Sequence, residues 1–370
     1  FLREHHERLL GNLGESRFDD EHPSAPMRSA ARVLRWLDEW RADAEADSTE
    51  KVLSPRDFPR FEGMPQSFGR FEVKGIVGRG GYGIVLRAYD PKLQRNVAIK
   101  VPKIDALLSP EANARFQRES TLAASLSHPG IVPVFETDHC NGIDYMVSEF
   151  VDGDDLASRC ARGQRFAAKE AARCVRRLSD AIEYAHQCGV LHRDLKPSNV
   201  LIPGDDLSLA KITDFGLATV IDETDLTHTG SVLGTPAFMS PEQADGRRSD
   251  IGPATDVYGL GTVLYQLLTG VPPFSGVTIA QTARAVVSEP PKSPRSLSPD
   301  CPKDLEAICL RALKKNPTSR YESAAAMRAD LDRFLSGEPT EARSPTIWAK
   351  GYSLARRYPA AAIAIGTLLL

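Results

Sequence analysis

Four short motifs follow one another along this chain, and their order constrains its fold more than any other feature. They lie at residues 78–85 (GRGGYGIV), 97–100 (VAIK), 192–199 (HRDLKPSN) and 214–216 (DFG). The first pair combines a glycine-rich turn with a lysine at the end of a strand-like run, whereas the second pair lies far along the chain beside helical sequence. The fold must therefore bring two separate parts of the chain together at one site.

The central part of the sequence divides into a strand-rich and a helix-rich half. Residues 71–148 read as short runs typical of strands, with one helix near residues 110–126. Residues 154–335 carry apolar side chains mostly at helical spacing. We therefore predict an α+β fold with a small antiparallel β lobe (71–148) that contains one helix, a hinge at residues 149–153 and a large helical lobe (154–335).

The flanking sequence differs in character from this domain, which we place at residues 69–335. Residues 1–68 predict two amphipathic helices and a linker, interpreted as a helical extension that packs on the domain or on a partner. Residues 336–358 are basic and aromatic, as in a juxtamembrane segment, and residues 359–370 form an uncharged apolar run. We interpret that run as the start of a truncated transmembrane helix, in a single-pass protein whose domain is cytoplasmic; a short apolar helix packed on the domain is the alternative.

Charge and cysteine usage exclude two classes of function. A net charge of −3 argues against bulk electrostatic binding to nucleic acid. The 6 cysteines include no Cys-x-x-Cys pair, so the sequence predicts neither a disulfide framework nor a zinc site.

The glycine-rich motif is suited to holding phosphate groups. Glycines at positions 78, 80 and 83 let two strands turn tightly, and they let backbone N–H groups approach a phosphate. The same spacing occurs in structural hairpins and in dinucleotide-binding folds, where it opens a helix. Here a strand-like run follows at residues 84–86, which favours a hairpin over the dinucleotide site.

The other motifs add the charged groups that phosphate chemistry needs. A lysine, an aspartate with an asparagine five residues on, and a second aspartate can together hold Mg-ATP and pass its γ-phosphoryl group to a hydroxyl. With all four motifs in this order, the chain resembles the protein kinase family over about residues 71–335. Lys196, two residues after Asp194, matches the Ser/Thr subtype. The chain is also similar to the bacterial membrane-anchored receptor-like Ser/Thr kinases of eukaryotic type.

The resemblance implies the two-lobed protein kinase fold, ATP and Mg²⁺ as cofactors, and a role for each polar residue of the motifs. Asp194 would be the catalytic base, and Lys196 would contact the γ-phosphate. Asn199 and Asp214 would hold Mg²⁺, for which Mn²⁺ could substitute. Thr235, in the loop that docks the acceptor, would bond to Asp194 and Lys196.

The resemblance also assigns the ATP site. Lys100 would bind the α- and β-phosphates and would be held there by Glu119, a pair that forms only when the predicted helix docks inward. Ser148, just before the hinge, is small, so we expect the pocket to admit ligands with a bulky group at that position. The expected ATP-binding residues are Gly78, Arg79, Gly80, Gly81, Tyr82, Gly83, Val85, Ala98, Lys100, Ser148, Glu149 and Val151.

The segment between Asp214 and Glu242 corresponds to the activation segment of the family. Arg193 could pair with a phosphate placed on this segment and so order it. Three hydroxyl residues are candidate autophosphorylation sites: Thr227, Thr229 and Ser231. The family's Ala-Pro-Glu appears here as Ser-Pro-Glu, and Glu242 would pair with Arg320 in a buried ion pair. Asp256 would steady the catalytic loop.

Two other classes of function stay open at this point. One is a pseudokinase scaffold that binds ATP and partners without turnover, but Lys100, Asp194 and Asp214 are all present. The other is a membrane-tethered interaction module in which residues 1–68 carry the main function. The expected partners are proteins with Ser or Thr acceptors and a membrane, with no nucleic acid, and the sequence leaves a homodimer open.

Overall fold

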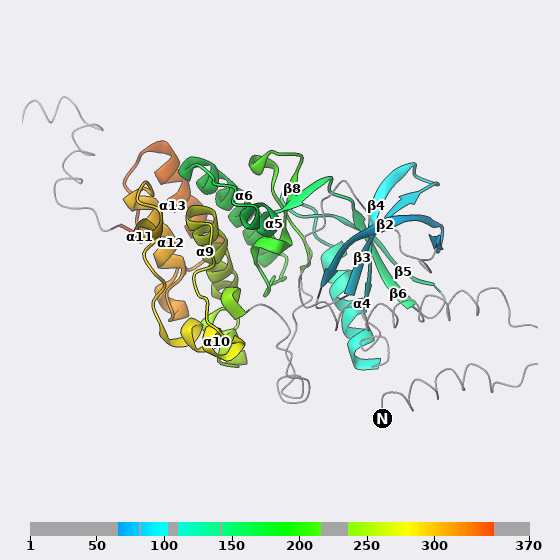
Figure 1. Cartoon of the computed structure of the whole chain (residues 1–370). Helices are drawn as coiled ribbons and strands as arrows, with labels where there is room; N and C mark the ends of the chain where they lie inside the picture. Colours follow the sequence, from blue (N-terminus) through cyan, green and yellow to red (C-terminus); the bar gives the residue numbers. More distant parts are fainter. Residues whose placement is uncertain (1–65, 81–82, 103–109, 141–142, 216–235, 344–370) are drawn as a thin grey trace, which may run out of the picture.

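The strand-rich half of the chain forms one antiparallel sheet, because its alternating apolar residues need a common core on one face. The computed structural model describes residues 66–80, 83–102, 110–140, 143–215 and 236–343. The sheet order is β1-β2-β3-β4-β6-β5 (Figure 1). Its strands are β1 (Ser67–Phe68), β2 (Phe71–Gly80), β3 (Gly83–Asp90), β4 (Arg95–Pro102), β5 (Val134–Cys140) and β6 (Ile143–Glu149).

One helix, α4 (Pro110–Ala124), accompanies this sheet, as predicted. It packs against β5 and β6 (Figure 1). Phe116 of α4 and Met146 of β6 are buried together, with Val134 of β5 against them. Further along the helix, Ala123 instead belongs to the core of the large lobe. The helix is therefore attached to both lobes, and its C-terminal part is the one anchored in the larger core.

The helix-rich half packs around α9 (Pro253–Thr269), which is buried along almost its whole length. A helix that is apolar on all sides is expected at the centre of a large domain. It ends at Gly270, whose φ of +78° is the left-handed conformation that closes many helices. The other helices of this lobe are α5 (Leu156–Ala161), α6 (Ala168–Gln187), α8 (Pro241–Ala244), α10 (Ile279–Ser288), α11 (Pro294–Leu297), α12 (Lys303–Ala312) and α13 (Ala324–Ser336).

A second, short sheet lies in the large lobe where it meets the small one. Its strands are β7 (Gly153–Asp155), β8 (Val200–Pro203) and β9 (Lys211–Ile212), in that order. The chain entering β5 crosses to this sheet, because the backbone N–H of Val132 donates to the carbonyl of Ile212 at 2.8 Å. This sheet therefore positions the segments next to β8 and β9 beside the cavity between the lobes.

The chain continues along the large lobe after α13. The buried carboxylate of Asp330 accepts hydrogen bonds from the backbone N–H groups of Glu341 (2.6 Å) and Ala342 (2.9 Å). Residues 338–343, the first part of the expected juxtamembrane segment, are thereby fixed to α13. The apolar run 359–370 and nearly all of the expected extension 1–68 lie outside the described residues. Among the described residues no helix has both the length and the apolar character needed to cross a membrane.

Candidate active site

A cavity of about 240 Å³ lies between the two lobes. Strands β2, β3, β4 and β6, the hinge, and the segments beside β8 and β9 form its walls. Mostly apolar walls with a few polar groups are the general form of a small-molecule site. Seven of the expected ATP-binding residues line this cavity: Gly78, Val85, Ala98, Lys100, Ser148, Glu149 and Val151.

The glycine-rich motif forms the turn between β2 and β3, as its spacing predicted. Gly80 pairs with Gly83 across this hairpin. Gly83 has a φ of +146°, and a Cβ atom there would lie 2.0 Å from the carbonyl oxygen of Val101. Only glycine fits this position. Gly83 is not among the described residues that line the cavity. The lining role expected of Arg79, Gly80, Gly81 and Tyr82 falls outside what the structure describes.

The catalytic-loop motif gathers two polar side chains around Asp194. The Lys196 ammonium lies 2.8 Å from an Asp194 carboxylate oxygen. The Asn199 amide nitrogen donates to the Asp194 backbone carbonyl at 2.8 Å, and it lies 3.2 Å from the Asp194 carboxylate. Asp194 itself is only half-buried. These contacts fix the Asp194 side chain while leaving it accessible.

A buried aspartate holds the backbone of this loop from below. Asp256, at the start of α9, accepts the N–H groups of His192 (2.9 Å) and Arg193 (2.7 Å). Arg193 has a φ of +66°, a conformation that costs energy for a residue with a side chain. His186 of α6 contacts the same carboxylate at 2.7 Å. Asp256 therefore has the position that the resemblance implied, and it stabilises a strained turn just before Asp194.

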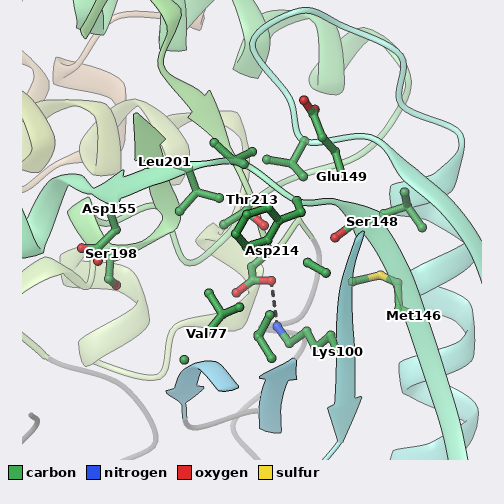
Figure 2. A pocket seen from close by; sticks show the side chains of 18 of the residues that line it. Val77, Lys100, Met146, Ser148, Glu149, Asp155, Ser198, Leu201, Thr213 and Asp214 are labelled. Carbon is green, nitrogen blue, oxygen red and sulfur yellow. Dashed lines mark hydrogen bonds and ion pairs between the residues drawn. The ribbon is translucent and has the colours of Figure 1, made fainter. Parts of the chain in front are cut away.

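Lys100 and Asp214 meet at the wall of the cavity. Their ammonium and carboxylate groups lie 2.7 Å apart, joined by the dashed line in Figure 2. Lys100 is buried, and Asp214 has a φ of +65°. Glu119, the expected partner of Lys100, lies in α4, but its side chain lies outside the described part of the chain. The structure thus brings the lysine to the aspartate expected to bind metal.

The residue after Asp214 packs beneath the catalytic loop. Phe215 is buried, and its ring meets the His192 ring edge-on at a centroid distance of 4.7 Å. His192 Nε2 lies 3.0 Å from the carbonyl oxygen of Thr213. These contacts tie the DFG motif to the HRD motif, so Asp214 and Asp194 are held in one arrangement.

A buried ion pair anchors the chain that follows the activation segment. Two hydrogen bonds join Glu242 in α8 to the Arg320 guanidinium at 2.7 and 2.8 Å, and both side chains are fully buried. Burial alone would raise the pKa of Glu242, but the hydrogen bonds and charge of Arg320 outweigh burial and lower it. The neighbouring Gln243 donates from its amide to the backbone carbonyl of Arg193. The pair expected from the resemblance therefore forms, and Gln243 joins it to the catalytic loop.

Comparison with known proteins agrees with this geometry. The model of the protein kinase domain matches residues 71–331, which is more than half of the chain. The chain belongs to the protein kinase family. It is 41% identical over 283 residues to the serine/threonine-protein kinase PknB of Mycobacterium leprae, covering 75% of this chain and 45% of that protein. PrkC of Bacillus subtilis is 40% identical over 282 residues, with 75% of this kinase and 42% of PrkC covered.

Solved structures place the kinase in the same family. The kinase domain of Mycobacterium tuberculosis PknI superposes with a TM-score of 0.57 at 26% identity, covering 72% of this chain and 96% of that one. The named curated relatives are Ser/Thr protein kinases, so the domain is of the Ser/Thr type. The kinase spans less than half the length of these curated relatives.

The residues around Asp214 fit a divalent cation bound with a nucleotide. Mg²⁺ is bound through oxygen ligands, usually by one or two carboxylates together with phosphates. Asp214 offers a carboxylate at the cavity wall. The amide nitrogen of Asn199 is engaged with Asp194, so its amide oxygen is the group left to accept. Asn199 and Asp214 are therefore suited to hold the metal that the resemblance implies.

Two residues that line the cavity were not expected from the sequence, although one of them, Ser198, lies within the motif at residues 192–199. Asp155 and Ser198 line the cavity, and Figure 2 shows them together across the pocket from Ser148. Asp155 caps α5 by accepting from the N–H of Ser158 at 2.8 Å, and an aspartate directly before a helix is the signal that could have identified it. The Glu149 carboxylate instead bonds to Lys211, so Glu149 can serve the cavity only through its backbone.

The remaining candidate residues fall on the segment 216–235, outside the described residues. They are the three candidate phosphorylation sites Thr227, Thr229 and Ser231, and the docking-loop residue Thr235.

Proposed function

We propose that this kinase transfers the γ-phosphoryl group of Mg-ATP to Ser and Thr hydroxyls of proteins. The observation that carries the proposal is the pairing of Lys100 with Asp214 at the wall of the cavity, next to the loop that holds Asp194 and Asn199. The two parts are joined where the backbone N–H of Thr213, the residue before Asp214, donates to the carbonyl of Asn199 at 3.0 Å. A scaffold without turnover would not need all four groups, so the geometry favours catalysis over the pseudokinase alternative.

The chemistry follows from the positions of the charged groups. The acceptor hydroxyl oxygen forms a bond to the γ-phosphorus while the bond to the β–γ bridging oxygen breaks, and ADP leaves with that oxygen. The Asp194 carboxylate orients the hydroxyl and takes its proton. Lys196, 2.8 Å from Asp194, supplies positive charge next to the transferred group. Mg²⁺, held by Asn199 and Asp214, would neutralise charge on the phosphates.

The direct test compares wild type with Asp194→Asn in transfer of labelled phosphate from Mg-ATP to a generic Ser/Thr protein. We expect the variant to lose at least about 100-fold in kcat, because general-base catalysis contributes about that much or more. Asp300→Asn, a substitution of the same kind at an exposed aspartate of the large lobe, is the matched control. Nucleotide binding without transfer by wild type would favour the scaffold instead.

We further propose that the kinase phosphorylates its own activation segment and acts in a membrane-anchored signalling protein with a cytoplasmic kinase domain. The support is the hydroxyl residues 227, 229 and 231 in the segment that Arg193 could order once phosphorylated, and the basic, aromatic and apolar sequence of residues 336–370. Mapping the labelled residues tests the first part. Flotation of the chain with phospholipid vesicles, against a chain ending at residue 358, tests the second.

A homodimer also belongs to this proposal, since the sequence left it open. Sedimentation across a range of protein concentrations tests it, and a single monomeric species at all concentrations would exclude self-association of this chain.

A further inference from the structure

Helix α4 is joined to the small-lobe sheet by a polar contact that phosphoryl transfer does not itself require. Gln117 of α4 donates from its amide nitrogen to a carboxylate oxygen of Asp144 at 2.8 Å. The other oxygen of Asp144 lies 2.6 Å from Nδ1 of His139. Asp144 lies on β6 and His139 on β5, and the two residues face each other across this strand pair.

The acceptor of this contact is buried, since Asp144 is only 6% exposed, although Gln117 and His139 are themselves exposed. A carboxylate removed from water needs hydrogen-bond donors, and a donor that meets an ionised acceptor makes one of the stronger bonds available to side chains. His139 holds one oxygen of Asp144 and so orients the other toward α4. The buried carboxylate is therefore preset to receive Gln117.

The apolar attachment of the same part of α4 to the small lobe is slight. Phe116 and Met146 form a small cluster of their own, separate from the large cores of the two lobes. Ala123, two turns further on, is instead buried in the large-lobe core. Among its described side chains, the middle of α4 thus rests on one small apolar cluster, the buried Ser120 and the Gln117–Asp144 bond. Elements with few buried contacts open most readily.

We propose that the Gln117–Asp144 bond is a positioning contact that keeps α4 docked on the sheet and thereby keeps Lys100 aligned for phosphoryl transfer. Glu119, the residue expected to pair with Lys100, follows Gln117 by two positions in the same helix. If α4 exchanges between docked and undocked positions, a bond made only in the docked position raises the population of the docked state. Gln117 and Asp144 then set the active fraction of the kinase without touching nucleotide. This inference rests on the proposed phosphoryl transfer.

An exchange of donor and acceptor tests the contact. Gln117→Glu places a carboxylate against Asp144, and we expect kcat to fall about tenfold, which corresponds to about 1.4 kcal/mol. Adding Asp144→Asn should restore kcat to within about twofold of wild type, because the new amide at position 144 can donate to the introduced carboxylate at position 117 while its oxygen still accepts from His139. If the contact only stabilised the fold, kcat would recover no more than the amount of folded protein does. Thermal melting measures the amount of folded protein in each variant.

The matched control is Gln187→Glu on α6, where Gln187 also faces a carboxylate, that of Glu183, at 3.4 Å on the exposed surface. It should leave kcat unchanged. Wild-type kcat in Gln117→Glu, or a double variant as slow as the single one, would overturn the proposal. Hydrogen exchange of the α4 amides gives a readout that does not depend on catalysis. Exchange should be faster in Gln117→Glu and return to the wild-type rate in the double variant, even if wild type proves inactive.

Discussion

At the scale of single residues, Ser148 decides how far the cavity extends behind the hinge. It is the last cavity-lining residue of β6 before Glu149, and Figure 2 shows it on the same side of the pocket as Met146. Ala98 of β4 pairs with Ser148 and also lines the cavity. Two small side chains at neighbouring positions leave room that a larger residue at position 148 would fill.

We therefore predict that wild type is inhibited by ATP-site ligands carrying a bulky apolar group directed at Ser148, and that Ser148→Met loses this inhibition by about tenfold or more. A buried clash of this kind costs about 1–3 kcal/mol, which corresponds to that range. The measurement is the inhibition constant for such a ligand and for its parent without the bulky group. Equal constants in wild type and variant, or sensitivity that appears only in Ser148→Gly, would show that the space is not there.

What the sequence could predict at this scale depended on whether the residues share one motif. Asp194, Lys196 and Asn199 lie in a single loop, so their spacing along the chain already places them together. Ser198 lies in the same loop, but Asp155 reaches the cavity from a separate segment, and no short pattern relates it to that loop. Asp155 could be identified as a helix cap but not as a cavity residue, because capping is a local property and the cavity wall is not.

At the scale of elements, the C-terminal end of α10 is closed by a lysine from another part of the large lobe. The Lys315 ammonium donates to the carbonyls of Ala285 and Val286 in the last turn of the helix. Carbonyl groups in a last turn lack N–H partners within the helix, and a positive charge there is favourable. The ammonium also lies 3.9 Å from the Phe274 ring centroid. Burial, with a smaller effect from the nearby charge of Arg320, lowers the pKa of Lys315 from 10.5 to about 8.

This shift predicts a pH dependence of stability. Between about pH 8 and pH 10.5 the unfolded chain holds the Lys315 proton more often than the folded chain does, so this group makes the unfolding free energy rise with pH in that window. Lys315→Met removes the titration and keeps a long apolar stem. We expect the unfolding free energy of wild type minus that of the variant to rise between about pH 8 and about pH 10, measured by urea denaturation.

Burial raises the pKa of the Cys160 and Cys301 thiols, so these groups also make the unfolding free energy depend on pH. Their contribution is the same in wild type and variant, and it cancels in the difference between the two. The exposed Lys292→Met serves as the control and should give a difference that does not vary with pH. A flat difference for Lys315→Met would contradict the predicted shift.

Elements were predictable where a periodic pattern created them. Helix α4 followed from apolar residues at helical spacing, and β2 to β4 followed from alternation around glycine-rich and lysine-bearing motifs. The contacts between elements did not follow. Gln117 and Asp144 lie 27 positions apart, in a helix and a strand, and neither residue breaks the pattern of its element. Polar pairs between elements are fixed by packing, which a single sequence does not show.

At the scale of the whole molecule, the large lobe is completed by chain that follows its last helix. Asp330 of α13 is fully buried, and its carboxylate also accepts from the hydroxyl of Tyr321 at 2.7 Å. The backbone N–H groups of Glu341 and Ala342 supply two further donors, and Arg333 pairs with Glu341 at 2.9 Å. Backbone N–H groups are the same in every residue except proline, so the sequence could not predict these contacts.

We predict that a chain ending at residue 336 is less stable than one ending at residue 343, by about 3 kcal/mol. The shorter chain leaves the buried carboxylate of Asp330 without two of its donors, and hydrogen bonds to charged groups contribute about 1.5–3 kcal/mol each. Both chains lack residues 344–370, so their difference isolates residues 337–343. Urea denaturation gives the free energies, and introducing Asp330→Asn in both chains should reduce the difference because the neutral side chain needs its donors less. Equal unfolding free energies of the two chains would show that residues 337–343 contact the large lobe without stabilising it.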